Sequence, residues 1–298
     1  MKIRNWIECS LNIVWKILKI GVCLVLCWVG AQVFLFSSYS IPSDSMDPTL
    51  LPGDRILVNK TYMGARLFNL KAAFEHEPFK IYRTWGWGKL KTGDVAVFNY
   101  PYPQTRDSIG FDIMAYYVKR CIGTPGDSLE IVKGYYKING KILIDLPTPV
   151  RRQQDSLHYV FCFGEKKIQG VSTKAFPKKK KIGWSIVNFG PLYIPKKGDI
   201  LLLNERHFLI YSKLIEWEQR KKLVWTNGAA YLDGKKITHY HFKKNYYFMS
   251  GDNVFNSVDA RYWGLIPEEF IAGKVSTIWK SVHPYTGEMR WERIGGVR

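Results

Sequence analysis

GDRILVNK, residues 53–60, has the form of a β-strand that begins at a tight turn. Glycine supplies a backbone conformation that turns require, the aspartate side chain bonds nearby backbone, and β-branched residues then extend the chain. The same start recurs in GDVAVFNY at 93–100, GDSLEIVK at 126–133 and GDILLLNE at 198–205. Asn139-Gly140 and Asp233-Gly234 predict two hairpins. The sequence therefore predicts a mainly β protein, an antiparallel β-sandwich or barrel-like domain.

Two stretches interrupt this pattern as insertions, at about 62–92 and 147–245. We expect β structure in both, and the longer one can form a subdomain. Helical periodicity is weak throughout the domain except around 208–222. The KKKK run at 178–181 is interpreted as a solvated loop, with contact to anionic lipid headgroups as the alternative.

An uncharged segment at 20–43 precedes the β pattern, and its residues 20–36 are nearly all apolar. About 20 apolar residues span a bilayer, and Lys16 and Lys19 before them can extend to its edge. The alternative is a cleaved secretory signal, but bulky Phe34 and Phe36 end the run with no small-x-small site behind them. We expect residues 1–38 to be a short cytoplasmic N-terminus and one membrane anchor.

The positive-inside rule then puts residues 39–298 on the outer, periplasmic face of the cytoplasmic (inner) membrane. The chain has 44 Lys+Arg against 25 Asp+Glu, a formal net charge of +19. Such charge favours a polyanionic partner, either nucleic acid or an anionic membrane. No nucleic-acid module is recognisable, so we expect a lipid bilayer and no nucleic acid as the partner.

The cysteines and histidines predict no metal site. The five cysteines contain no CxxC motif, and the histidines lack an HExxH or another ligand spacing. Cys121 and Cys162 could pair, although nothing in the sequence requires it. His239 and His241 share a strand face, which is interpreted as coincidence.

One serine stands out in SIPSDSMDPTLLPGD, residues 40–54. Pro42 and Pro48 stiffen the backbone on either side of Ser45, which can expose its hydroxyl at a sharp turn. Ser, Pro and Asp are also ordinary turn formers, so by itself the stretch is more often a turn. A serine nucleophile also needs a base, and no Gly-x-Ser-x-Gly elbow or histidine triad is present.

A lysine can be that base. In MAYYVKRCIGTPGD, residues 114–127, strand alternation puts Lys119 on the same face as Tyr117 and Cys121, with Arg120 on the other face. Desolvation among apolar neighbours would lower the pKa of Lys119 and free its amine. The alternative is an ordinary lysine at a strand edge.

A third segment, MSGDNVFNSVDARYWGLIP at 249–267, concentrates polar side chains before an apolar run. A polar cluster of this kind must be satisfied internally if it is buried, and it can orient a catalytic amine. The polar residues are Asp252, Asn253, Asn256, Ser257, Asp259 and Arg261.

Together these segments resemble bacterial type I signal peptidase (leader peptidase), a membrane-bound Ser–Lys endopeptidase. The resemblance lies in PSDSMDPTL with LPGDRILVNK, GDVAVFNYP, YYVKRCIGTPGD and GDNVFNSVDARYWG, in the family's order behind an N-terminal anchor. It implies Ser45 as nucleophile and Lys119 as general base. It also implies an oxyanion hole made of the Ser45 N–H and the Ser43 hydroxyl, and a hydrogen bond from Ser257 that orients the lysine.

The resemblance further implies two ion pairs behind the site, Asp259 with Arg261 and Asp252 with Arg120. Two departures from the family pattern affect only this supporting region. Val254 stands where the family usually has Arg, and Ala260 where it usually has Ser.

The expected reaction is removal of signal peptides from exported preproteins, without a metal or cofactor. The signal peptide would lie extended beside Tyr117 and residues 40–42, in the manner of an added strand. Small pockets lined by Ile41, Met46 and Val118 would admit small residues at the first and third positions before the cut.

Two other functions stay open. One is a self-cleaving Ser–Lys peptidase of the repressor type and related fold, against which the anchor and the missing DNA-binding module argue. The other is a non-catalytic membrane-anchored β-domain that binds partners, which requires the combination of Ser45, Lys119 and Ser257 to be accidental.

Overall fold

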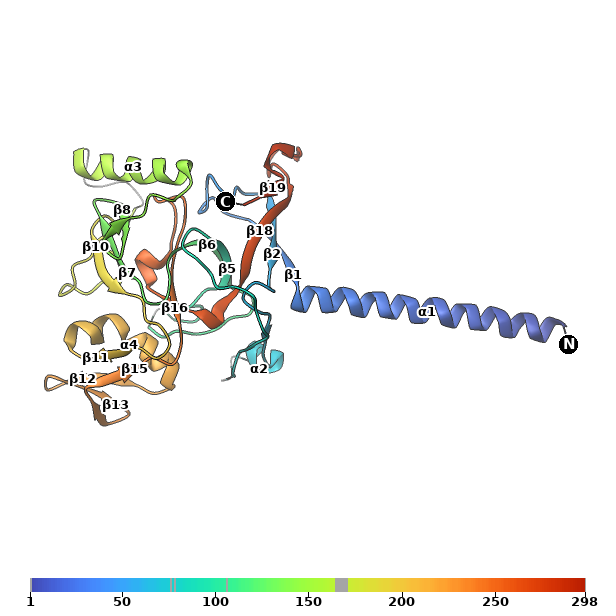
Figure 1. Ribbon diagram of the computed structural model, residues 1–298, viewed down its shortest axis with the longest axis horizontal. Coiled ribbons are helices and arrows are strands. Elements are labelled where there is room, and N and C mark those ends of the chain that lie inside the picture. The colour runs from blue at the N-terminus through green and yellow to red at the C-terminus, as the bar shows by residue number, and fades with distance from the viewer. Residues whose placement is uncertain (1, 76, 78, 106, 164–170, 298) are drawn as a thin grey trace.

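A computed structural model describes residues 2–75, 77, 79–105, 107–163 and 171–297. A long helix, α1 (Lys2–Phe34), projects from a β domain (Figure 1). Its segment Ile13–Phe34 is long and apolar enough to cross a membrane, and its side chains do not pack inside the molecule. The helix ends before the expected apolar run does, since Phe36 already begins the first strand.

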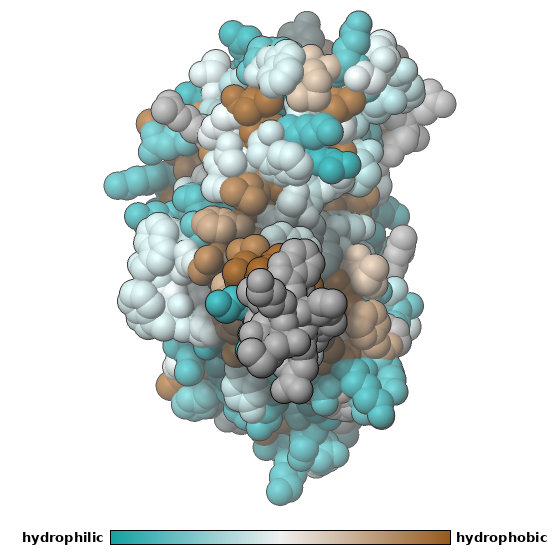
Figure 2. Space-filling view, turned by 90° about the vertical axis from the view of Figure 1, so that its right-hand side faces the viewer, coloured by the Kyte–Doolittle hydropathy of each residue, from teal (hydrophilic) through white to brown (hydrophobic). Residues whose placement is uncertain are grey.

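The junction between α1 and the domain is fixed by Lys60. Its Nζ donates to the Gln32 carbonyl at 2.7 Å, and its backbone N–H donates to the Leu35 carbonyl at 2.8 Å. A lysine at the C-terminal end of a helix satisfies carbonyls that have no partner within the helix. Figure 2 looks along α1 and shows hydrophobic surface beside the base of this helix.

Among the described residues the largest sheet has eight antiparallel strands, in the order β1-β2-β18-β5-β6-β16-β17 with β19 paired to β18. The predicted antiparallel β architecture behind one apolar helix is confirmed. The strands are β1 (Phe36–Ser40), β2 (Asp54–Asn59), β5 (Val95–Asn99), β6 (Tyr116–Gly123), β16 (Tyr246–Ser250), β17 (Ile266–Pro267), β18 (Ile271–Ser281) and β19 (Gly295–Gly296).

The predicted Gly-Asp turns are present before all four strands. Gly53 and Gly93 have φ of +91° and +94°, a region that favours glycine. Each aspartate carboxylate accepts a hydrogen bond of 2.7–2.9 Å from the backbone N–H three residues earlier in the chain. These local bonds explain why the Gly-Asp pair marks strand starts so regularly. The bonded pairs are Asp54 with Leu51, Asp94 with Lys91, Asp127 with Thr124, and Asp199 with Lys196.

Side chains on the two faces of the large sheet enter two different apolar clusters. In β5, Val95 and Val97 belong to the smaller cluster, while Ala96 and Phe98 belong to the larger one. Strand alternation produces this division, because successive side chains point to opposite faces. Lys119 and Arg120, which are consecutive on β6, are both buried and therefore point to opposite faces of this sheet.

The remaining strands form smaller sheets, and both predicted Asn/Asp-Gly hairpins are present at β8–β9 and β13–β14. A four-stranded sheet has the order β10-β7-β8-β9. Its strands are Phe189–Tyr193 (β10), Ser128–Val132 (β7), Tyr135–Ile138 (β8) and Lys141–Ile142 (β9). The other pairings are β11 (Ile200–Leu202) with β15 (His239–His241), β12 (Leu223–Thr226) with β13 (Ala229–Leu232) and β14 (Lys235–Ile237), and β3 (Arg66–Leu67) with β4 (Tyr82–Arg83).

The insertion at 147–245 contains the expected β structure, but it also contains a helix that the sequence does not predict. This helix, α3 (Thr148–Phe163), buries only Val150, Gln154 and Leu157. The first ten residues of this helix, TPVRRQQDSL, are mostly polar or charged, so the sequence shows too few apolar residues there to indicate a packed helix. The predicted helix near 208–222 is α4 (Glu205–Gln219). The short helices are α2 (Leu70–Phe74), α5 (Ala260–Trp263), η1 (Glu268–Phe270) and η2 (Trp291–Arg293).

Candidate active site

Ser45 lies in a turn that follows β1 and is held at both ends. Ile41 exchanges backbone hydrogen bonds with the segment before β2, donating to the Asp54 carbonyl and accepting from Gly53, each at 2.9 Å. After the serine, the Met46 carbonyl accepts from the Leu50 N–H at 2.9 Å, and the Met46 side chain is buried. The turn is therefore anchored by apolar burial while Ser45 itself stays half-exposed.

Lys119 approaches this serine from another strand of the same large sheet. It lies on β6, which pairs with β5 and β16, and only 4% of its surface is exposed. Its Nζ lies 2.5 Å from the Ser45 Oγ and 5.7 Å from the centre of the Tyr117 ring. Burial lowers the pKa of Lys119 to about 8, although the nearby Asp259 carboxylate opposes this shift. A lysine with this pKa is partly neutral near physiological pH and can accept a proton.

Ser43 lies next to the nucleophile candidate. Its hydroxyl is 3.5 Å from the Ser45 Oγ, which is at the long limit for a hydrogen bond. The two hydroxyls thus open on the same side of the turn. The oxyanion role of Ser43 and of the Ser45 N–H stays a prediction.

The segment after β16 clamps the serine turn through contacts that the sequence does not predict. The Asn253 N–H donates to the Ser45 carbonyl at 3.2 Å, and its side-chain amide donates to the Asp44 carbonyl at 3.2 Å. The Asn256 amide donates to both oxygens of the Asp44 carboxylate at 3.0 Å. The concentration of polar residues at 252–261 is the only feature of the sequence that indicates such contacts. It does not indicate which residue each side-chain amide bonds.

Two buried ion pairs lie behind the site. Arg120 pairs with Asp252 at 2.7 Å, and Arg261 pairs with Asp259 at 2.7 Å. Burial alone would raise the pKa of Asp259, but the charge and hydrogen bonds of Arg261 lower it below its usual value. Arg261 also donates to the Val254 carbonyl at 3.1 Å. This contact uses the backbone, and the Val254 side chain is buried among apolar residues, so valine fits a position that is usually Arg.

Ser257 differs from the expectation. Among the described residues its buried hydroxyl has no hydrogen-bond partner, and the expected bond to the Lys119 amine is not formed. The amine is instead directed at the Ser45 Oγ. Ser257 is nevertheless adjacent to the nucleophile, because a Cβ on Gly251 would lie 2.1 Å from the Ser257 Oγ and 2.5 Å from the Ser45 carbonyl oxygen. Its lysine-orienting role stays a prediction.

A second set of buried contacts reaches the site from the four-stranded sheet. The Tyr136 hydroxyl on β8 lies 2.5 Å from the Ser250 Oγ, which lies 3.1 Å from the Asp259 carboxylate. The sequence analysis did not find Tyr136 or Ser250. No local pattern identifies them, since Tyr136 and Ser250 are 114 positions apart.

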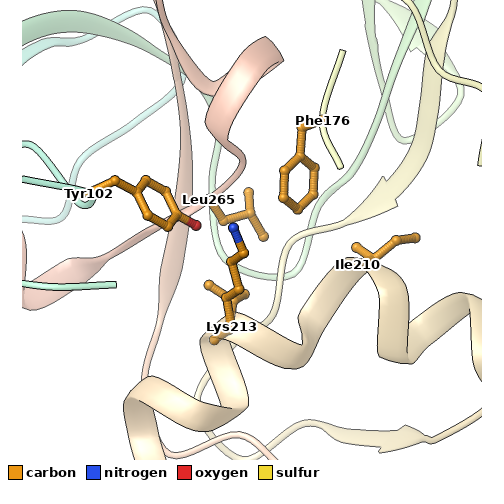
Figure 3. Close-up of a pocket in the computed structure, with 6 residues that line it drawn as sticks. Tyr102, Phe176, Ile210, Lys213 and Leu265 are labelled. Atoms are coloured by element: carbon orange, nitrogen blue, oxygen red, sulfur yellow. The ribbon is translucent and has the colours of Figure 1, made fainter. Parts of the chain in front are cut away.

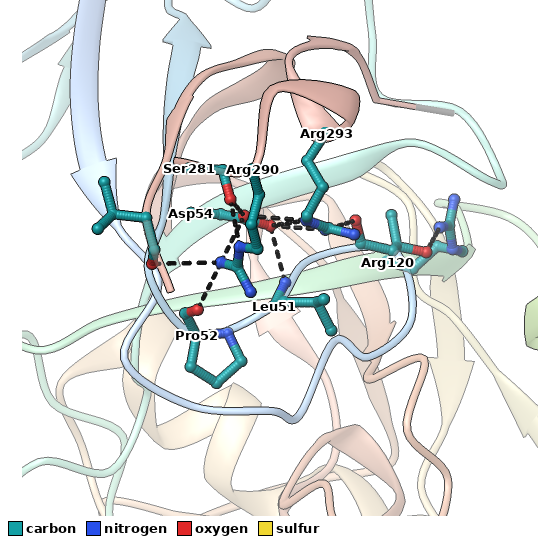
Figure 4. A network of polar contacts seen from close by, with 9 residues as sticks. Leu51, Pro52, Asp54, Arg120, Ser281, Arg290 and Arg293 are labelled. Carbon is teal, nitrogen blue, oxygen red and sulfur yellow. Dashed lines mark hydrogen bonds and ion pairs between the residues drawn. The ribbon is translucent and has the colours of Figure 1, made fainter. Parts of the chain in front are cut away.

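The turn that follows Ser45 is also held by the C-terminal segment (Figure 4). Arg293 pairs with the buried Asp54 at 2.6 Å and donates to the Thr49 carbonyl at 3.0 Å. Burial would raise the pKa of Asp54, but the hydrogen bonds from Arg293 and Ser281 lower it. Arg120 in turn donates to the Thr49 Oγ1 at 3.0 Å. The network therefore links the tail, the turn and the strand that carries Lys119.

The four residues predicted to contact the substrate lie in two different apolar clusters, one on each face of the large sheet. Ile41, Met46 and Val118 meet in the smaller apolar cluster. The Tyr117 ring lies on the opposite face, stacked on Tyr100 with ring centres 4.7 Å apart. The structure thus brings the three residues expected to line small pockets together beside the Ser45 turn.

The two cysteines of the β domain do not pair with each other. Cys121 and Cys162 are both free; Cys121 is buried, which raises the pKa of its thiol well above the usual value, and Cys162 is exposed. Within the described ranges no group of three His, Cys, Asp or Glu residues could hold a metal ion.

Comparison with known proteins places this geometry in a family context. The family model described as signal peptidase, peptidase S26, matches residues 14–280. The chain is 30% identical over 280 residues to signal peptidase I of Buchnera aphidicola subsp. Schizaphis graminum, covering 89% of this chain and 75% of the relative. It is 27% identical over 259 residues to signal peptidase I of Pseudomonas aeruginosa, covering 83% and 66%. A solved signal peptidase I from Enterococcus faecalis V583 has a TM-score of 0.29 and 16% identity, covering 62% of this chain and 96% of that one.

Proposed function

The chain belongs to the signal peptidase family, peptidase S26, and we propose that it removes signal peptides from exported preproteins with Ser45 as nucleophile and Lys119 as general base. The observation that carries this proposal is the 2.5 Å contact between the Lys119 Nζ and the Ser45 Oγ. A buried amine with a pKa of about 8 beside a half-exposed hydroxyl is the arrangement that serine activation requires.

The reaction begins with neutral Lys119. Its amine accepts the Ser45 proton while the Ser45 Oγ attacks the scissile carbonyl carbon. The Ser43 hydroxyl and the Ser45 N–H stabilise the resulting oxyanion, a contribution of about 3 kcal/mol for each donor. The lysine ammonium then protonates the leaving amine, and an acyl-enzyme remains on Ser45.

Neutral Lys119 next takes a proton from a water molecule, whose oxygen attacks the acyl carbonyl carbon. The Ser45–acyl bond then breaks, the lysine ammonium returns its proton to the Ser45 Oγ, and the signal peptide leaves with a new carboxylate. The ion pair of Asp259 with Arg261 supports this cycle electrostatically. Burial lowers the pKa of Lys119, whereas the nearby carboxylates, Asp259 first among them, raise it and limit this decrease. The lysine can therefore gain and lose a proton twice in each turnover.

The signal peptide binds beside β1 and β6 as an added strand, with its last residues over the Ile41, Met46 and Val118 cluster. These side chains are packed closely, so the pockets admit only small residues at the first and third positions before the cut.

Helix α1 is proposed to hold the β domain at the outer face of the cytoplasmic membrane. Its apolar length and the lysines before its apolar core support a single span with a cytoplasmic N-terminus. The anchor confines the enzyme and its membrane-inserted substrate to one surface, which raises their effective concentration.

The test is cleavage of a purified preprotein by the full chain in phospholipid vesicles. We expect Ser45→Ala and Lys119→Ala each to reduce kcat by at least about 10³-fold, the scale on which a catalytic group is lost. Matched controls are Ser156→Ala and Lys91→Ala, which remove an exposed hydroxyl and an exposed amine elsewhere. Unchanged cleavage by the two site variants with intact circular dichroism would refute the Ser–Lys assignment. A wild-type chain that binds preproteins without cleaving them would instead support the non-catalytic alternative.

A further inference from the structure

A cavity of about 640 Å³ lies between the active-site region and the insertion at 147–245. Its volume is within the range of ligand-binding sites, roughly 300–1,000 Å³. One wall is formed by the catalytic side of the domain and includes Tyr100, Ser257 and Trp263. The opposite wall is formed by residues 171–179 and by α4. The reaction described above does not use this cavity.

The cavity approaches the proposed catalytic pair through Ser257 and Tyr100, which line it, whereas Ser45 and Lys119 do not. Ser257, which lines it, is only 5% exposed, and its hydroxyl has no partner among the described residues. This hydroxyl adjoins the Ser45 carbonyl across Gly251. On the other side, the Tyr100 ring that lines the cavity stacks on Tyr117, whose ring adjoins the Lys119 amine.

The far wall is basic. Lys178, Lys179 and Lys213 line it, whereas Asp107 is the one acidic residue among the described lining residues. Within the described part of the chain Lys178 and Lys179 form no ion pair, although Lys181 of the same run pairs with Glu205. The cavity therefore has an excess of positive charge that an acidic ligand would complement.

A small recess adjoins the cavity, shares Lys213, Tyr102 and Phe176 with it, and combines this charge with apolar surface. Figure 3 shows Lys213 extending from α4 with its amine directed between Tyr102 and Phe176. The amine lies 5.0 Å from the centre of the Tyr102 ring, and burial lowers the pKa of Lys213. Ile210 and Leu265 complete this recess. A ligand with both apolar and carboxylate groups fits such a lining.

We propose that the cavity binds the first residues of the mature segment, after the cut, and favours acidic side chains there; this inference rests on the proposed function. The two faces of β6 indicate which side of the scissile bond lies toward the cavity. Val118 faces the cluster proposed for the signal peptide, whereas Tyr117 faces the cavity side. Lys119 must protonate the leaving amine, so the leaving segment starts beside Lys119 and enters the cavity at the end that Ser257 lines.

The test uses the full chain in vesicles and preproteins that share one signal peptide and cleavage site. The second to fourth residues after the cut are all Asp, all Ser or all Lys. Partly exposed charge pairs are each worth about two- to fivefold in an equilibrium. We expect kcat/KM at low salt to be about five- to tenfold higher for the Asp substrate than for the Lys substrate, and this ratio to shrink at about 0.5 M salt.

The double variant Lys178→Glu/Lys179→Glu should reverse the preference between the Asp and Lys substrates while leaving the Ser substrate within about twofold. The control is Lys180→Glu, which makes the same type of substitution in the same lysine run, with half the charge change, at a residue that does not line the cavity. It should keep the wild-type preference. Lys178 and Lys179 are exposed and lie in a loop outside the catalytic machinery, and an unchanged circular dichroism spectrum of the double variant checks that its fold is kept.

The outcomes separate the two proposals. If wild type cleaves all three substrates with equal kcat/KM, or if Lys180→Glu shifts the preference as much as the double variant, the cavity is not the site of the mature segment. If wild type cleaves none of them, the proposed function itself fails. A preference that reverses only in the double variant supports the inference.

Discussion

The pH dependence of cleavage follows from the burial of Lys119. Only the neutral amine can take the Ser45 proton, and burial lowers the pKa of this amine from 10.5 to about 8. The neutral fraction is then roughly a tenth at pH 7 and about nine tenths at pH 9. We therefore expect kcat/KM to rise about tenfold between pH 7 and pH 9 and then to level off.

The assay is cleavage of a peptide substrate without groups that titrate between pH 6 and 10, because kcat/KM then reports the ionisation of the free enzyme. An ordinary exposed lysine would predict a different curve, with a rise of about tenfold per unit that continues beyond pH 9. A flat profile from pH 6 to 9, or a rise that does not level off by about pH 10, would refute lysine as a base with this pKa.

The same pKa shift affects stability, and its sign can be stated. Between pH 8 and pH 10.5 the unfolded chain binds more protons at Lys119 than the folded chain does, so stability rises with pH across this window. Below pH 8 the cost of keeping the lysine buried is fully present, on the order of 3 kcal/mol. We expect Lys119→Met to raise the Tm at pH 7 despite abolishing cleavage. This gain should shrink as the pH approaches 10.5; a Tm difference that does not change with pH would contradict the reasoning.

Three further changes test the contacts around the site. Gly251→Ala would place a new Cβ 2.5 Å from the Ser45 carbonyl oxygen. We expect it to reduce kcat at least about tenfold and to lower stability by about 1–3 kcal/mol. A wild-type kcat would show that the Ser45 turn can move to accommodate the methyl group without loss of activity. Asp44→Asn removes a charge that raises the pKa of Lys119, so the rising limb of the pH–rate profile should move to lower pH by a few tenths of a unit. A shift to higher pH would contradict this electrostatic effect. Arg120→Met leaves a buried carboxylate unpaired and should destabilise the protein by about 3–5 kcal/mol in a thermal or denaturant unfolding experiment; a loss below about 1 kcal/mol would mean that the pair contributes little.

Several parts of the fold could be predicted because they depend on neighbours in the chain. The Gly-Asp turns form from a glycine conformation and an aspartate that bonds backbone three residues away. The two hairpins need only Asn139-Gly140 and Asp233-Gly234 at positive φ. The apolar helix follows from an uninterrupted run of apolar residues, although the helix ends at Phe34, two residues before the run does.

The candidate site could be predicted in part for the same reason. Strand alternation alone separates Lys119 from Arg120 and directs them to opposite faces of β6. The resemblance of the motifs then suggested the partners of both residues, and Arg120 does pair with Asp252. The helix α3 was missed because its first ten residues are mostly polar or charged.

What the sequence by itself determined is therefore the local chemistry: which segments extend, where they turn, and which hydroxyl and amine have neighbours suited to reaction. Only the tertiary structure decided that Asn253 and Asn256 clamp Asp44 and Ser45, and that Ser257 lines a cavity together with Lys178, Lys179 and Lys213. The clamp joins residues more than 200 positions apart. Such contacts depend on how strands pack in three dimensions, and no spacing along the chain encodes them.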